Sequence, residues 1–170
     1  KAVIKLYLKT TLKILENKRR KSMTHFQEAI ELQINENLQA NEELKKQADP
    51  VWIELFQISK RSPIPLGEKT GVYKIYHKEQ DEPMVIGEGV LVRRKGRHVS
   101  VFNNKGIAIA HSGGSSSPCS TATKMYQYDS NIDNWFFSWC ELPKTISTKY
   151  ETILIRKLKP KFNLQSMAGL

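Results

Sequence analysis

Two short apolar runs on either side of an acidic turn limit most strongly how this chain can fold. Residues 72–77 and 84–87 carry the β-branched and aromatic side chains typical of strands, and the segment "EQDEP" between them suits a turn. The next segment, 88–102, has the periodicity of a helix in spite of Gly96. We therefore expect a strand, a turn and a second strand that leads directly into a helix.

The elements after this unit predict the fold class. A helix is predicted over 118–129, a strand over 135–142, and a last helix over 148–159, which ends before a proline. The resulting order is strand, strand, helix, loop, helix, strand, helix. This order predicts an α+β domain with a small sheet over residues 67–170.

The first 66 residues are predicted to form a helical arm. A basic helix is expected over 1–20, a longer helix over 24–47, and a short apolar helix over 51–59. Prolines 63 and 65 break regular structure, so the boundary with the main domain is placed at 66/67. The arm would contact DNA or mediate dimerisation, and its basic helix could equally be a solvated charged element.

The formal net charge is +10, with 27 lysines and arginines against 17 aspartates and glutamates. A basic domain of this size often binds a polyanion, because lysine and arginine release the counterions condensed on phosphates. The alternative is a charge that only keeps the protein in solution. Nucleic acid is therefore a candidate partner on charge alone.

The composition also bears on location. No segment approaches the roughly 18 apolar residues that a membrane span needs, and no signal peptide is visible, so we expect no membrane association. The two cysteines, Cys119 and Cys140, do not amount to a disulfide framework. Reduced thiols in the cytoplasm are the default for such a chain.

Several polar residues lie on otherwise apolar faces of the predicted elements. Arg94 and His98 project from one side of a helix, Glu151 shares a face with apolar residues of the last helix, Tyr73 lies in a strand, and Asn163 follows the last helix. These residue types suit phosphodiester hydrolysis. A carboxylate can hold a hydrated Mg²⁺, arginine can bind a phosphate oxygen, and tyrosine or histidine can position or deprotonate water.

Residues 70–163 resemble the GIY-YIG nucleases. "GVY" at 71–73 and "VIG" at 85–87 are similar to the two signatures of the family, and "RKGRH" at 94–98 is similar to its catalytic helix. The segment 150–163, "YETILIRKLKPKFN", matches the C-terminal part, where a glutamate leads into an apolar helix and an asparagine follows a proline.

The resemblance implies a three-stranded antiparallel sheet flanked by helices, with an insertion around 103–122. It also implies one divalent metal per site, Mg²⁺ or alternatively Mn²⁺, and close backbone approach at Gly87. The implied roles are water orientation or general base for Tyr73, phosphate stabilisation for Arg94, proton relay or phosphate contact for His98, metal binding for Glu151 and organisation of the site for Asn163.

The chain departs from the family at Val85, where the second signature usually has a tyrosine. Valine cannot donate a hydrogen bond or lose a proton, so another group supplies the function or the site is impaired. Tyr76 is the preferred substitute. The absence of one auxiliary acid/base group would slow the reaction without making the protein inert.

Each candidate also has a purely structural interpretation. Tyr73 alone could be a half-buried strand residue, and Arg94 with His98 could belong to a solvated basic helix. Glu151 could close a capping box with Thr148. The Ser/Gly-rich segment 111–123 could be a linker or a loop that contacts phosphates.

The function expected from the resemblance is metal-dependent cleavage of double-stranded DNA, most readily by a site-specific restriction enzyme. Such an enzyme would pair two subunits across the twofold axis of its site. A catalytically impaired DNA-binding module, or a mobile-element, repair or RNA-directed nuclease, are the alternatives. The predicted DNA contacts are Lys74, Arg93, Arg97, Lys105, His111, Ser115, Ser116, Arg19 and Arg20.

Overall fold

The structure is a computed structural model that describes residues 24–33, 50–60, 64, 67–107 and 120–163. The chain divides into two compact units, Lys1–Pro50 and Val51–Leu170. This division lies before the predicted boundary at 66/67, because a strand at 56–57 already belongs to the sheet of the second unit.

In the first unit, residues 24–33 form a helix, which confirms the first part of the helix predicted over 24–47. Phe26, Ala29 and Gln33 are its buried residues, and their spacing places them along one face. The predicted helix over 1–20, with Arg19 and Arg20, lies outside the described residues.

The second unit has the α+β composition that the sequence predicts. Its elements are β1 (Phe56–Gln57), β2 (Thr70–His77), β3 (Val85–Val90), α3 (Leu91–Asn103), α4 (Ser120–Tyr128), a short 3₁₀ helix (Ile132–Asn134), β4 (Trp135–Glu141) and α5 (Lys144–Leu158). Among the described residues, no helix has both the length and the hydropathy needed to cross a membrane.

The sheet has four antiparallel strands in the order β1-β4-β2-β3, so the expectation of three strands was wrong. The fourth strand, β1, comes from the segment predicted as a helix over 51–59. Main-chain hydrogen bonds from Ile53 to Trp139 (2.8 Å) and from Ile58 to Trp135 (2.9 Å) tie this segment to β4. The open edge of β4 thus outweighs the weak helical preference of a short apolar run.

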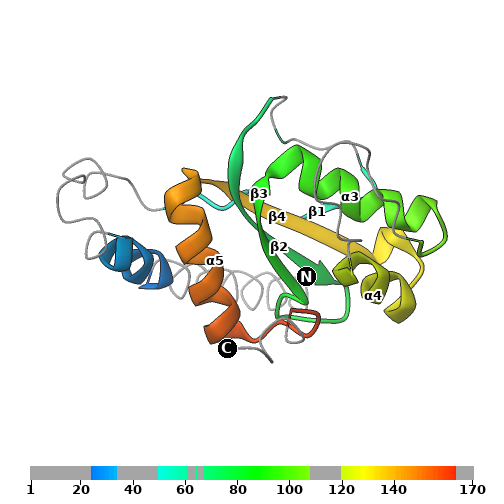
Figure 1. The fold of residues 1–170 in the computed structure, drawn as a ribbon. Coiled ribbons are helices and arrows are strands. Elements are labelled where there is room, and N and C mark those ends of the chain that lie inside the picture. The colour runs from blue at the N-terminus through cyan, green and yellow to red at the C-terminus, as the bar shows by residue number, and fades with distance from the viewer. Residues whose placement is uncertain (1–23, 34–49, 61–63, 65–66, 108–119, 164–170) are drawn as a thin grey trace, which may run out of the picture. The chain divides into compact units, whose positions relative to one another are not determined.

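Helices cover both faces of the sheet: α5 packs on one face, and α3 and α4 lie on the other (Figure 1). Side chains alternate along a strand, so Tyr73 and Ile75 of β2 face α3, whereas Lys74 and Tyr76 face α5. The aromatic side chains Trp135 and Phe137 of β4 belong to the buried cluster on the α3 side. This arrangement decides which of the predicted site residues can meet.

A candidate active site around strand β3

Tyr73 and His98 form a buried pair on the α3 face of the sheet. The Tyr73 hydroxyl lies 3.2 Å from Nε2 of His98, and the phenol ring stacks on Phe137 with 5.2 Å between centroids. The two side chains are only 5% and 1% exposed. The His98 ring is thus too buried to contact a phosphate directly in this conformation, and its Nε2 faces the Tyr73 hydroxyl.

Gly87 provides the space that the Tyr73 ring occupies. It lies directly opposite Tyr73 across the β2–β3 pairing, and a methyl group at this position would overlap the tyrosine hydroxyl and ring. The predicted approach at Gly87 was of backbone, whereas the group that lies against this glycine is the phenol of Tyr73.

Arg94 lies over a second glycine at the end of the same strand. Gly89 has φ +132°, a conformation that favours glycine, and an added methyl group would lie 2.7 Å from Nε of Arg94. Helix α3 begins at Leu91, three residues later than the predicted start at 88, because Glu88 and Gly89 continue the strand. Arg94 therefore extends from the first turn of α3 back toward the strand end.

Helix α5 places Glu151 on the other side of β3. The helix begins at Lys144, with Pro143 before it, and the Thr148 hydroxyl donates to the main-chain carbonyl of Lys144 (3.1 Å). Thr148 and Glu151 are thus inside the helix, and the capping-box interpretation was wrong. Lys144, Ser147 and Glu151 are spaced by three and four residues, so they share one face of α5.

The pKa of Glu151 is raised to about 7, mainly by burial and also by the nearby negative charge of Glu88. The positive charges of Arg94 and Lys144, and the main-chain N–H of Glu88 that donates to the carboxylate, act in the opposite direction. Glu151 and Arg94, which come from helices on opposite faces of the sheet, therefore interact around Glu88 and Gly89 of the edge strand.

Glu88 and Lys144 are site residues that the sequence analysis missed. Lys144 Nζ donates to both carboxylate oxygens of Glu88, at 2.6 and 2.5 Å, and the Ser147 hydroxyl lies 3.4 Å from one of them. The predicted helix boundaries hid this cluster, since Glu88 was assigned to a helix and Lys144 to the segment before one.

Asn163 clamps the edge strand beside Gly87. Its Oδ1 accepts from the main-chain N–H of Ile86 (2.9 Å), and its Nδ2 donates to the carbonyl of Ile86 (2.7 Å). Both backbone groups of one residue are thus paired by one amide side chain. Asn163 thereby fixes the main chain of the edge strand next to Gly87.

Two predicted site residues are buried on the α5 face of the sheet, away from the Tyr73–His98 pair. Lys74 is 6% exposed, and its Nζ lies 3.8 Å from the ring centroid of Trp52, so it cannot contact DNA as predicted. Tyr76 is buried on the same face, where burial raises its pKa well above the usual range. It therefore cannot replace a tyrosine at Val85, whose buried side chain is on the Tyr73 face.

The other predicted DNA contacts are dispersed. Arg93 is exposed and pairs with Glu68, Arg97 is half-buried on α3, and Lys105 is exposed just after that helix. His111, Ser115 and Ser116 lie outside the described residues, as does most of the predicted insertion at 103–122.

The donor set at the site fits a hard divalent cation that keeps most of its water ligands. The described parts of the chain contain no cluster of three or more histidine, cysteine, aspartate or glutamate side chains that could enclose a metal. Glu151 is instead a single, partly exposed carboxylate with a second carboxylate, Glu88, close enough to raise its pKa. Added positive charge would relieve this repulsion, and Mg²⁺ is often held by one or two carboxylates.

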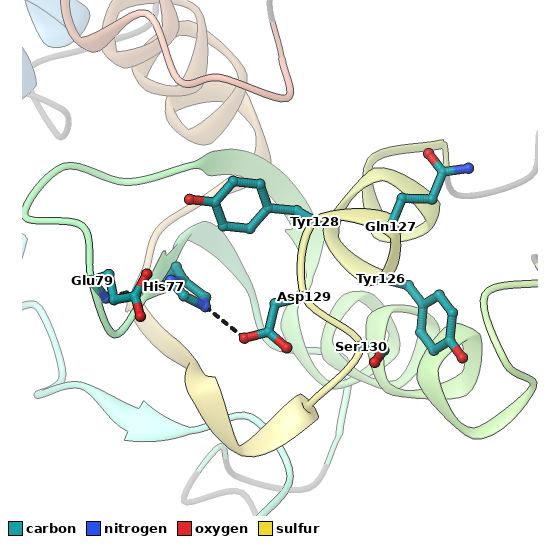
Figure 2. Close-up of a pocket in the computed structure, with 7 residues that line it drawn as sticks. All are labelled: His77, Glu79, Tyr126, Gln127, Tyr128, Asp129 and Ser130. Atoms are coloured by element: carbon teal, nitrogen blue, oxygen red, sulfur yellow. Dashed lines mark hydrogen bonds and ion pairs between the residues drawn. The ribbon is translucent and has the colours of Figure 1, made fainter.

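A separate open pocket of about 520 Å³ lies between the end of β2 and the end of α4 (Figure 2). His77 Nε2 pairs there with Asp129 at 2.9 Å, and hydrogen bonds from Asn134 and His77 lower the pKa of Asp129 to about 2. None of the residues around Gly87 and Gly89 lines this pocket. The pair ties β2 to the loop after α4 and is distinct from the candidate site.

The raised pKa of Glu151 predicts how its replacement changes stability. The pKa is raised from 4.5 to about 7 on folding, so the folded state favours the protonated carboxyl. The contribution of Glu151 to the free energy of unfolding is therefore fully present below pH 4.5 and is lost as the pH rises through 7. In the absence of divalent metal, Glu151→Gln should therefore gain stability relative to the wild type at pH 8 and gain little at pH 4. Thermal unfolding in EDTA across this range measures it, and a difference independent of pH would contradict the assigned environment.

Comparison of the chain with protein-family models, with curated proteins and with solved structures gives no significant match.

Proposed function

We propose that this protein is a metal-dependent endonuclease that hydrolyses phosphodiester bonds of double-stranded DNA. The observation that supports it best is the arrangement around β3, where the Tyr73–His98 pair, Arg94 and Glu151 approach Gly87–Gly89 from three different elements. A structural pair or a solvated helix accounts for each residue alone. The three groups together match the requirements of phosphodiester hydrolysis, and their order resembles that of the GIY-YIG nucleases.

The proposed mechanism assigns one task to each group. Arg94 binds a non-bridging oxygen of the scissile phosphate, since a guanidinium can donate two parallel hydrogen bonds to it. Tyr73 orients the attacking water and accepts its proton on the hydroxyl oxygen, while the tyrosine proton passes to Nε2 of His98, 3.2 Å away. Glu151 would hold the Mg²⁺ ion, which when bound stabilises negative charge on the phosphate and on the leaving oxygen.

The finer assignment is a site-specific restriction enzyme in the cytoplasm that acts as a homodimer on DNA. The net charge of +10 and the resemblance support this assignment. The buried valine at position 85 favours a second candidate, a DNA-binding module of the same fold with impaired catalysis. The same experiment separates the two.

The experiment is cleavage of long, sequence-diverse duplex DNA, such as phage genomic DNA, by the intact protein with Mg²⁺, with Mn²⁺ and with EDTA. Discrete fragments that require the metal are expected for a site-specific endonuclease. A metal-dependent smear would retain the nuclease and remove the specificity. DNA binding without cleavage under every condition would exclude the nuclease and leave the binding module.

A further inference from the structure

The ion pair between Lys144 and Glu88 is unusual because its two members differ strongly in exposure. The Lys144 side chain is 61% exposed, whereas that of Glu88 is 11% exposed. Surface lysines are ordinarily mobile, and ordering one costs conformational entropy. Here a largely buried carboxylate holds an exposed ammonium through two hydrogen bonds, with the Ser147 hydroxyl beside it.

The position of this ammonium relates it to the candidate site. Lys144 is the first residue of α5, on the helix face that also carries Glu151, and its charge lowers the pKa of that carboxylate. The N-terminal end of a helix carries partial positive charge, which adds to that of the ammonium. Both hydrogen bonds of the Lys144 ammonium go to the single carboxylate of Glu88, so at least one of its three N–H groups can donate to another acceptor.

We propose that Lys144 binds a DNA phosphate beside the Glu151 carboxylate, and that Glu88 is a positioning residue that holds the Lys144 ammonium for this contact. The inference rests on the proposed action on DNA and adds a phosphate-binding group to it. The simpler interpretation, in which Lys144 only neutralises Glu88, predicts no role for the lysine in DNA binding.

The test is the affinity of the full chain for a synthetic duplex, measured by fluorescence anisotropy in EDTA at several salt concentrations. Lys144→Met should raise the Kd roughly tenfold near 0.1 M salt and reduce the slope of log K against log salt by about 0.9, as expected for one lost phosphate contact. Lys144→Arg should retain most of the affinity. Lys157→Met, in the last turn of the same helix, is the control and should retain both affinity and slope.

Glu88→Gln tests the positioning role by the sign of its effect. Removing a negative charge near DNA should strengthen binding if only long-range electrostatics matters. If Glu88 positions Lys144, Glu88→Gln should weaken DNA binding in the protein that retains Lys144. The same substitution should not weaken binding when it is added to the Lys144→Met variant. Tighter binding in both backgrounds would overturn the positioning role.

The outcomes also separate this inference from the proposed function. Wild-type affinity and slope for Lys144→Met, with metal-dependent cleavage intact, would refute the phosphate contact and leave the nuclease standing. Lower affinity for Lys144→Met in a protein that never cleaves DNA would support the contact and refute the nuclease. If Lys157→Met lost as much DNA affinity as Lys144→Met, the effect would come from the overall positive charge of the protein, and the inference would be overturned.

Discussion

Replacing Glu151 with glutamine should lower the rate of DNA cleavage by roughly 10³-fold or more. Charge stabilisation by a bound metal is worth several kcal/mol at the transition state, and each 1.36 kcal/mol corresponds to a factor of ten in rate. Glutamine keeps the size of the side chain and removes its negative charge, so the fold should persist while metal binding is lost. Single-turnover cleavage in Mg²⁺ gives the rate, and Mn²⁺ binding followed by electron paramagnetic resonance gives the affinity.

The matched control for this substitution is Glu54→Gln, which makes the same change at an exposed glutamate of the same compact unit. It should cleave DNA and bind Mn²⁺ as the wild type does. Wild-type cleavage by Glu151→Gln would remove the carboxylate from the mechanism. Slow cleavage with unchanged Mn²⁺ affinity would show that Glu151 acts on the substrate and does not hold the metal.

Replacing Tyr73 with phenylalanine should slow cleavage by about 10² to 10⁴-fold, the usual cost of losing a general acid/base group. The change removes only the hydroxyl that contacts His98 and leaves the ring free to stack on Phe137. DNA affinity in EDTA should therefore be unchanged, and the loss should appear in the single-turnover rate constant.

Gly87→Ala should also slow cleavage, because its methyl group would displace the Tyr73 ring.

Tyr76→Phe is the control for Tyr73→Phe, because it removes the same group from the same strand on the opposite face of the sheet. The rate should remain at the wild-type value. If Tyr76→Phe slowed cleavage and Tyr73→Phe did not, Tyr76 would be the tyrosine of the site and the assignment of Tyr73 and His98 would be wrong.

Much of the fold was predictable because its elements carry strong local signals. The strands around Val72 and Trp135 and the helix that contains Arg94 and His98 follow directly from composition and periodicity. The strand at Phe56–Gln57 was not predictable in this way, since it forms only where β4 offers an unpaired edge. Its short apolar sequence has no preference strong enough to decide between helix and strand.

The candidate site was likewise predictable from the sequence only in part. Tyr73 and His98 could be assigned to one site from motif order, but their contact and the partners of Glu151 could not be predicted. Glu88 and Lys144 meet Glu151 only because Gly89 extends the strand and Pro143 starts the last helix early. An error of a few residues in each boundary was enough to conceal the whole charged cluster.

The clamp on Ile86 has a consequence for assembly. β3 is the last strand of the sheet, and such a strand can recruit an extended segment of another molecule through its outward N–H and C=O groups. The carboxamide of Asn163 already occupies both groups at Ile86, in the manner of one residue of a neighbouring strand. A continuous intermolecular sheet through the middle of β3 is thereby blocked, and any association between two copies of this chain would use other surfaces.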